Sequence, residues 1–416
     1  TMASTSPPTH GMPVEPSAAG PEPLRADASR SAVPLVLNPG VEATRLDCAA
    51  QEPMVMCTVR GRSGRSARYT LPARLWTVLE AFDGRRTTPE ALDAVAGGTD
   101  EAAGYTRDAL DRLVTGFLVP KRILIPRDAE GDELEPRPSP GRASYLSVKV
   151  PLIPARVVEL VARGLTGLYD RPVAVLATLA VVAAHVWFYL DLAPAAGLAL
   201  DDLGGGDVVL VLLLMNVGTL AHEFGHATAA VRHGCRGTTI GWGLYLHMTV
   251  LYTDVSEAWR LPRLKRAVVD LGGIYFQALF LLGLLGLYFA TGSPVPLFAF
   301  VLTDFTIANA LNPFLRLDGY WLISDVFGIV NLRSQSARLG QFVLLRLLRR
   351  RGADAMSWTL DRRTTGALIG YTALSVLFFA YTAVLLLKWV GGGIGSTIPE
   401  RVAAFVALAT RPDPDW

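Results

Sequence analysis

Cysteine is scarce in this sequence, and so are the charged side chains that a soluble protein would carry. The chain of 416 residues has three cysteines, which are Cys48, Cys57 and Cys235. Three cysteines are too few for a disulfide scaffold, and the lack of a CxxC pair argues against a cysteine zinc site. We therefore expect Cys48 and Cys57 to be ordinary thiols in a reducing compartment, with a bridge between them as the alternative.

The low charge content points to a membrane. Charged residues make up 18% of the chain, hydrophobic residues make up 51%, and the mean hydropathy is +0.34. Several uncharged windows approach ~20 residues, the length that a helix needs to cross a bilayer. This predicts a mainly α-helical, polytopic membrane protein in contact with membrane lipid, with a soluble part. We expect no nucleic-acid partner, and the sequence does not indicate an oligomeric state.

The composition changes along the chain predict four regions. Residues 1–33 are rich in Pro, Ser and Ala, lack the apolar segment of a signal peptide, and are expected to be disordered. Residues 34–126 read as a small soluble domain, and residues 127–150 as a charged, proline-rich linker. The membrane domain is expected to span residues 151–416 and to open with an amphipathic surface helix at 151–165.

The soluble region has the pattern of a small winged-helix-like α+β domain. The stretches PLVLNPGVEATRL and MVMCTVRGRSGRSARYTL alternate as strands do, with a Gly-Arg-Ser turn. Three helices follow; Gly84 ends the first, and Thr88 is expected to be the N-cap of the second. The positions expected to face the core are Leu75, Val78, Leu79, Phe82, Leu110, Leu113 and Phe117.

The stretch YTLPARLWTVLEAFDGRRTTPEALDAV, with LDRLVTGFLV after it, resembles the PqqD family of peptide-binding domains. Members of that family recognise the leader peptides of ribosomally synthesised, modified peptides. The resemblance implies that residues 34–126 bind a peptide precursor, which would add a strand to the edge of the domain's sheet. The alternative is a small helical domain with a different partner, and the sequence does not identify the contacting residues.

Five membrane spans are predicted, at residues 172–193, 207–231, 266–291, 295–315 and 366–390. Arginine and lysine gather before the first span and in the segments after the second and fourth spans. The positive-inside rule therefore places these segments and the N-terminal domain in the cytoplasm.

The stretch 240–256, between the second and third spans, is apolar but rich in β-branched and aromatic residues with interspersed glycine. It predicts strands or a re-entrant element, which the protein must cover if it lies at membrane depth. A strand edge there could bind an extended peptide substrate.

The second span contains the segment LAHEFGHATAA. On a helix, His222 and His226 lie one turn apart on the same face, so both imidazoles can reach one ion. Glu223 lies beside them and can deprotonate a water that the metal activates. Ionisable groups at membrane depth cost about 3 kcal/mol each, so this cluster predicts a compensating partner, one Zn²⁺ per chain. The alternative is a histidine pair that is satisfied by hydrogen bonds between helices.

A catalytic zinc takes three protein ligands and keeps a fourth position open. The segment NALNPFLRLDGYWLISD offers Asp318 as the third, after a span that Pro313 breaks and before Gly319, which permits close backbone packing. In the alternative, Asp318 is the N-cap of a helix that begins at Tyr320. His185 is expected to make a hydrogen bond between helices. Residues that compete as ligands are His247, Asp254, Asp304 and His233.

HEFGH followed by NPFLRLDG resembles the site-2 protease family of intramembrane zinc metalloproteases, over about residues 172–330. LYTDVSEAWRLPRLKRAVVDLGG and NPFLRLDGYWLISD resemble its branch of peptide zinc metalloproteases. The resemblance implies that His222, His226 and Asp318 bind zinc and that Glu223 is the catalytic base. Many members have Asn at the place of Ala310 and Pro at the place of Leu315, and Arg316 is an unusual charge here. The substrate contact therefore falls to Asn312 or Asn309, with His247 as a further candidate.

The function expected from these features is a zinc metalloendopeptidase in a bacterial cytoplasmic membrane, which removes the leader from a modified peptide precursor. One alternative is regulated intramembrane proteolysis of a membrane-anchored protein. A third is a non-enzymatic export or immunity partner in a peptide biosynthesis cluster, which would keep the metal for structure.

Overall fold

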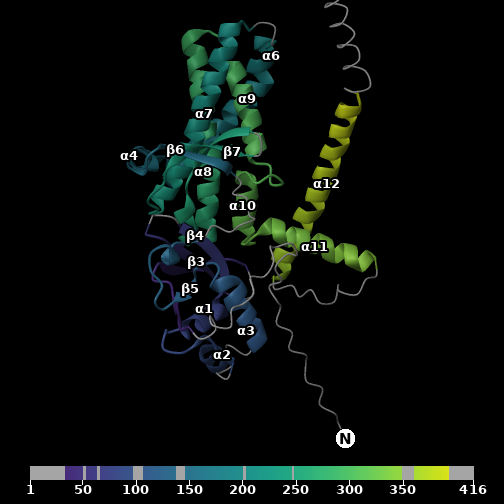
Figure 1. Ribbon diagram of the computed structural model, residues 1–416. Coiled ribbons are helices and arrows are strands. Elements are labelled where there is room, and N and C mark those ends of the chain that lie inside the picture. The colour runs from purple at the N-terminus through teal and green to yellow at the C-terminus, as the bar shows by residue number, and fades with distance from the viewer. Residues whose placement is uncertain are drawn as a thin grey trace, which may run out of the picture. The chain divides into compact units, whose positions relative to one another are not determined.

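The computed structural model describes eight stretches of the chain, and most of their residues are helical (Figure 1). The predicted disordered segment, residues 1–33, lies outside them except for Val33. The chain divides into two compact units, one up to Val330 and one that begins at Asn331, and each is described by itself. The described stretches are residues 33–49, 53–62, 66–96, 106–136, 146–199, 203–245, 248–348 and 360–392.

The N-terminal part combines two small antiparallel sheets with short helices, which confirms the α+β prediction for this region. The first sheet has the order β2-β3-β4, and the second pairs β1 with β5. The strands are β1 (Leu35–Leu37), β2 (Val41–Leu46), β3 (Met54–Arg60), β4 (Ser66–Pro72) and β5 (Leu124–Pro126). The helices are α1 (Ala73–Glu80), α2 (Thr88–Ala96) and α3 (Arg107–Leu113), which continues as a π-helical turn to Leu118.

The core of this region contains the residues that the helical pattern selects. The three core-facing positions within α1 are buried, and so are Phe82 just after this helix and Leu110 of α3, while Leu113 and Phe117 pack partly buried against the same cluster. One detail differs: Thr88 is the first helical residue of α2, and Glu90 accepts the Thr87 N–H at 2.9 Å. The helix thus starts at Thr88, one residue earlier than a cap at Thr88 would place its start.

The three cysteines are free thiols, so no bridge joins Cys48 to Cys57. Cys57 lies in β3 with no exposed surface, and burial raises the pKa of its thiol to about 12. A thiol that stays protonated is neither a nucleophile nor a metal ligand. The cysteines therefore leave the chemistry of the chain to other residues.

Within the described stretches, four helices are long and apolar enough to cross a membrane, which indicates a multi-pass membrane protein. The fourth predicted span, residues 295–315, is shorter than the others, because α9 (Val295–Ala310) ends before Asn312 and Pro313. Large hydrophobic side chains such as Leu176, Leu179 and Leu213 are more than half exposed, as a lipid-facing surface requires. The first candidate span, residues 171–196, begins with α5 (Arg171–Trp187). The other three are α7 (Gly205–Arg232), α8 (Arg263–Thr291) and residues 362–388 of α12 (Arg362–Gly392).

Helices α7, α8 and α9 lie side by side and form the centre of the membrane part (Figure 1). Glycine lets α7 and α8 approach each other closely, because a Cβ on Gly225 of α7 would collide with the main-chain oxygen of Gly272 on α8. Small residues at such a crossing let two membrane helices pack backbone to backbone. Tyr169 adds a hydrogen bond at this crossing, from its hydroxyl to the main-chain oxygen of Gly225 at 3.0 Å.

The stretch 240–256 folds as a hairpin, which confirms the prediction of strands. β7 (Ile240–Tyr245) pairs with β8 (Met248–Thr253), and β6 (Leu146–Ile153) pairs with the other side of β7. The order β6-β7-β8 leaves β8 at an edge of this sheet. Strand β6 occupies residues that the sequence suggested were linker and helix, so the amphipathic helix α4 begins only at Ala155 and ends at Leu165.

A short turn after α9 leads into α10 (Asp318–Phe327), the last helix of the first unit. The second unit contains α11 (Leu332–Leu347) and α12, whose contact includes a hydrogen bond from Thr372 to the hydroxyl of Ser336 at 3.1 Å.

Candidate metal centre

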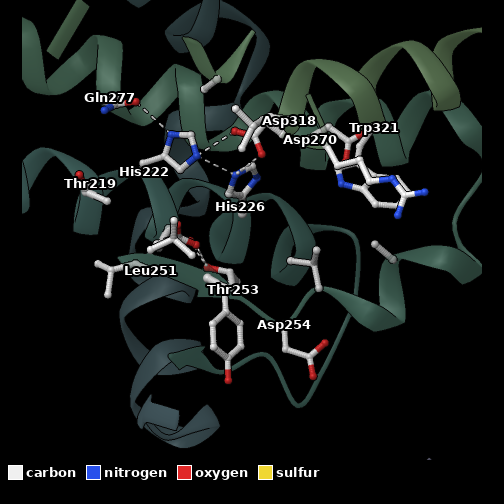
Figure 2. Close-up of a pocket in the computed structure, with 18 of the residues that line it drawn as sticks. Thr219, His222, His226, Leu251, Thr253, Asp254, Asp270, Gln277, Asp318 and Trp321 are labelled. Carbon is white, nitrogen blue, oxygen red and sulfur yellow. Dashed lines mark hydrogen bonds and ion pairs between the residues drawn. The ribbon is translucent and has the colours of Figure 1, made fainter. Parts of the chain in front are cut away.

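Two helices bring three donor groups to one point, as Figure 2 shows. His222 and His226 project from the same face of α7, and their Nε2 atoms lie 3.1 Å apart. Asp318, the first residue of α10, points its carboxylate at both rings. Oδ2 lies 2.9 Å from Nε2 of His222, and Oδ1 lies 3.5 Å from Nε2 of His226.

This donor set fits a zinc ion. Tetrahedral zinc holds nitrogen and oxygen ligands at about 2.0–2.2 Å, which places the ligand atoms roughly 3.3 Å from one another. The three separations at this centre, 2.9, 3.1 and 3.5 Å, surround that value. Among the described residues, no fourth histidine, cysteine or acidic side chain joins the group. A metal held by these three ligands would keep a position open.

The outer nitrogens of the imidazoles are oriented by neighbours on α8. Nδ1 of His226 lies 2.7 Å from the main-chain oxygen of Val269, and Nδ1 of His222 lies 3.0 Å from Oε1 of Gln277. Gln277 donates in turn to the Thr306 hydroxyl at 2.9 Å. Because both Nδ1 atoms face acceptors, they carry the hydrogens, and both Nε2 lone pairs point toward the centre. A cation between these groups would satisfy both lone pairs and the carboxylate.

Gly273 on α8 leaves the space that such a cation would take. A Cβ at this position would lie 2.5 Å from the Nε2 atoms of both His222 and His226. No real Cβ approaches a nitrogen so closely without displacing it. A side chain at Gly273 is therefore incompatible with the observed arrangement of the two imidazoles.

We expect the Gly273→Ala variant to bind zinc at least about tenfold more weakly, because the methyl group displaces both imidazoles from the convergent geometry. Zinc competition with a chromophoric chelator measures this change on the purified chain. Gly283→Ala is the matched control, since a Cβ at Gly283 on the same helix meets nothing within 4 Å. Equal affinity in the two variants would contradict this assignment of the metal position.

The centre opens into a cavity of about 740 Å³, whose walls come from α7, α8, α9, α10 and strand β8. Glu223 lines it next to the metal ligands and is 6% exposed. Its carboxylate does not belong to the convergent donor group; instead, Oε2 accepts a hydrogen bond from the Thr253 hydroxyl at 2.6 Å. This leaves Glu223 placed to exchange a proton with a molecule in the cavity.

Asp318 serves the donor cluster rather than capping its helix. Leu317 takes the N-cap position of α10, and no side chain caps that end. The prediction that Gly319 permits close packing is confirmed, because a Cβ there would collide with the main-chain oxygen of Leu311.

A buried ion pair two turns along α10 fixes this helix against α8. Nε of Arg266 donates to Oδ1 of Asp325 at 2.8 Å, and both side chains are less than a tenth exposed. Other guanidinium nitrogens of Arg266 donate to the main-chain oxygens of Leu261 and Asp47. Asp325 follows Asp318 by seven residues, so the two carboxylates lie on the same face of α10. The pair therefore helps to hold the third donor in place.

The residues that the sequence suggested for substrate binding separate into three cases. Asn309 lines the cavity. Asn312 closes a turn, where its Oδ1 accepts the Phe314 N–H at 2.9 Å. His247 lies outside the described residues. Ala310 and Arg316, the departures from the family pattern, both line the cavity.

Three of the competing candidates, Asp304, Asp254 and His233, are described, and they do not belong to the donor cluster. Asp304 pairs with His185, whose Nε2 lies 3.0 Å away, and accepts a hydrogen bond from the Tyr189 hydroxyl at 2.7 Å. The expectation that His185 bonds between helices is thereby confirmed. Asp254 lines the cavity and accepts the Ser256 N–H at 3.0 Å. His233 is the C-cap residue of α7.

Several contributors to the site were missed by sequence reasoning. Gln277 could have been predicted, because an amide side chain in an otherwise apolar span indicates a buried polar contact. The sequence did not indicate a role for Gly273 or Thr253, because glycine is common in membrane helices and threonine is common in strands. Their roles depend on which elements meet, and the sequence alone does not give that.

Comparisons with known proteins add no further assignment: no family model, no curated protein and no solved structure matches the chain.

Proposed function

We propose that this chain is a zinc metalloendopeptidase of the site-2 protease type, which acts at a bacterial cytoplasmic membrane. The observation that carries the proposal is that three donor groups converge and that a fourth, acidic side chain lies beside them without belonging to the group. His222, His226 and Asp318 would hold the ion, and Glu223 would be the base. Open coordination next to a general base is the pattern of a hydrolytic zinc site.

In this mechanism the chain's own residues supply binding, orientation and proton transfer. A bound zinc ion would polarise the scissile carbonyl and make an attacking water more acidic. The Glu223 carboxylate accepts the proton of that water and later delivers it to the amine of the departing peptide. Gln277 and the Val269 oxygen keep the imidazoles aligned throughout.

The proposed substrate is a modified peptide precursor whose leader binds the N-terminal domain on the cytoplasmic side. The PqqD-like pattern of residues 34–126 supports this choice. The position of the edge strand β8 favours binding of the substrate as an extended peptide, because its residues from Thr249 to Thr253 line the cavity. An extended segment can pair its backbone with such an edge. A proline substitution that tests this pairing belongs on β8, because β8 is at the edge of the sheet and β7 is its central strand.

Two alternatives remain distinct from this proposal. Regulated cleavage of a membrane-anchored protein would use the same centre, with the N-terminal domain as a gate. A non-enzymatic partner with a structural zinc is disfavoured, because structural sites take four protein ligands and need no adjacent base.

The function can be tested without knowledge of the natural substrate. The full-length chain, purified in detergent, is incubated with a peptide library made from a bacterial proteome, and new N-termini are isotopically labelled. We expect zinc-loaded protein to generate a defined set of new N-termini, chelation with 1,10-phenanthroline to remove it, and added zinc to restore it. A library that stays uncut with zinc bound would overturn the peptidase proposal.

A further inference from the structure

The side chain of Glu223 is oriented by a hydrogen bond from a strand outside its own helix. The carboxylate is buried on α7, and the group that holds it is the hydroxyl of Thr253, the last residue of β8. The distance of 2.6 Å between Oγ1 and Oε2 is that of a strong hydrogen bond to a charged acceptor. The same hydroxyl lies 3.0 Å from the main-chain oxygen of Glu223. Thr253 therefore contacts both ends of this residue.

We propose that Thr253 is the positioning residue for the catalytic base, an inference that rests on the proposed peptidase function. A glutamate has three rotatable side-chain bonds, so an unrestrained carboxylate would sample several positions in a cavity of this size. Proton transfer requires an oxygen within hydrogen-bond reach of the water. One short hydrogen bond from the cavity wall selects a single orientation of Oε2 and leaves Oε1 for the reacting molecule.

The contact between the hydroxyl and Oε2 suits both protonation states of the base during turnover. While Glu223 is a carboxylate, the Thr253 hydroxyl donates to Oε2. Once Oε1 has taken a proton from water, Oε2 is the carbonyl oxygen of the acid and still accepts the same hydrogen bond. The side chain is thus held in the same place before and after the transfer, and the proton on Oε1 remains free to pass to the departing amine.

Thr253 does not contact the donor atoms of the metal cluster. The hydrogen bonds of His222 and His226 go to α8, and Asp318 is fixed through α10. Removal of the Thr253 hydroxyl should therefore leave metal binding and peptide binding largely intact while misaligning the base. This predicts a change in kcat with little change in KM.

The test compares Thr253→Val, which removes the hydroxyl at nearly constant shape, with Thr253→Ser, which keeps it. The probe is the peptide that the zinc-loaded protein cuts fastest in the library experiment. We expect Thr253→Val to lower kcat about 10- to 100-fold, with KM within about twofold and full zinc content, because a misplacement near 1 Å costs about that much. Thr253→Ser should recover most of the rate. Thr178→Val, which removes an exposed hydroxyl on α5 that bonds only within its own helix turn, is the control.

A double variant separates action through Glu223 from a general effect on the fold. If Thr253 acts only through the base, Thr253→Val should add nothing to the loss that Glu223→Gln causes. Wild-type kcat in Thr253→Val, equal losses in the Val and Ser variants, or loss of zinc would each overturn the inference. A Glu223→Gln variant that cuts at the normal rate would instead refute the proposed catalytic centre, in which Glu223 is the base.

Discussion

Replacing Glu223 with Gln should lower kcat about 10²- to 10⁴-fold, the range that a general base contributes, while zinc content stays at one per chain. The amide keeps the size of the side chain but cannot accept a proton from water. Glu223 is not among the three convergent donors, so its replacement should leave the zinc affinity of the site unchanged. Cleavage of the fastest-cut library peptide and metal analysis of the same preparation measure both quantities.

The control for this variant is Glu133→Gln, at a half-exposed glutamate in the N-terminal part whose partner is Arg122 at 3.9 Å. It removes the same charge from the chain, and we expect it to cut normally. If Glu223→Gln also cuts at the normal rate, Glu223 is not the base, and the cleavage does not come from the proposed centre. If zinc is lost from this variant, Glu223 is a ligand and the role assigned to it is wrong.

Replacing Asp318 with Ala should remove both zinc and activity. The carboxylate is the one donor that α10 contributes, and its loss leaves two imidazoles to hold the ion. Changes in residues that merely orient a ligand cost 10- to 100-fold in metal affinity, so we expect loss of a ligand to cost more than about 100-fold. Competition titration of the purified variant with zinc measures the affinity.

Asp304→Asn provides a matched comparison, because Asp304 is also a carboxylate within hydrogen-bond distance of a histidine in the membrane part. It was a competing ligand on sequence grounds, and it lies outside the donor cluster. We expect this variant to bind zinc as the wild type does. Retention of zinc by Asp318→Ala, or its loss from Asp304→Asn, would place the metal elsewhere.

The parts of the site that the sequence predicted are those that depend on local geometry. His222 and His226 share a helix face because four residues make about one turn, and that holds wherever the helix lies. Asp318 is distant in sequence; it was predicted as the acidic residue after a span that Pro313 breaks, and the resemblance of NPFLRLDG to a family motif supported the choice. The structure adds the convergence of the three groups.

The parts that escaped prediction depend on pairing between distant segments. Strand β6 precedes β7 by nearly a hundred residues, and its apolar residues fit a linker end or a helix start equally well until their partner is known. Thr253 meets Glu223 only because β8 lies against α7. The end of α9 was misjudged for a different reason, since hydropathy continued beyond Ala310 while the Asn-Pro step stopped the helix.

The central claim is that two imidazoles and one carboxylate hold a zinc ion and leave room for water. X-ray absorption at the zinc edge of the purified, full-length chain tests it most directly. The account predicts a single shell of nitrogen and oxygen ligands at about 2.0–2.1 Å, the scattering pattern of two imidazoles, and no sulfur. A sulfur shell near 2.3 Å, a single imidazole, or protein that binds no zinc would contradict it.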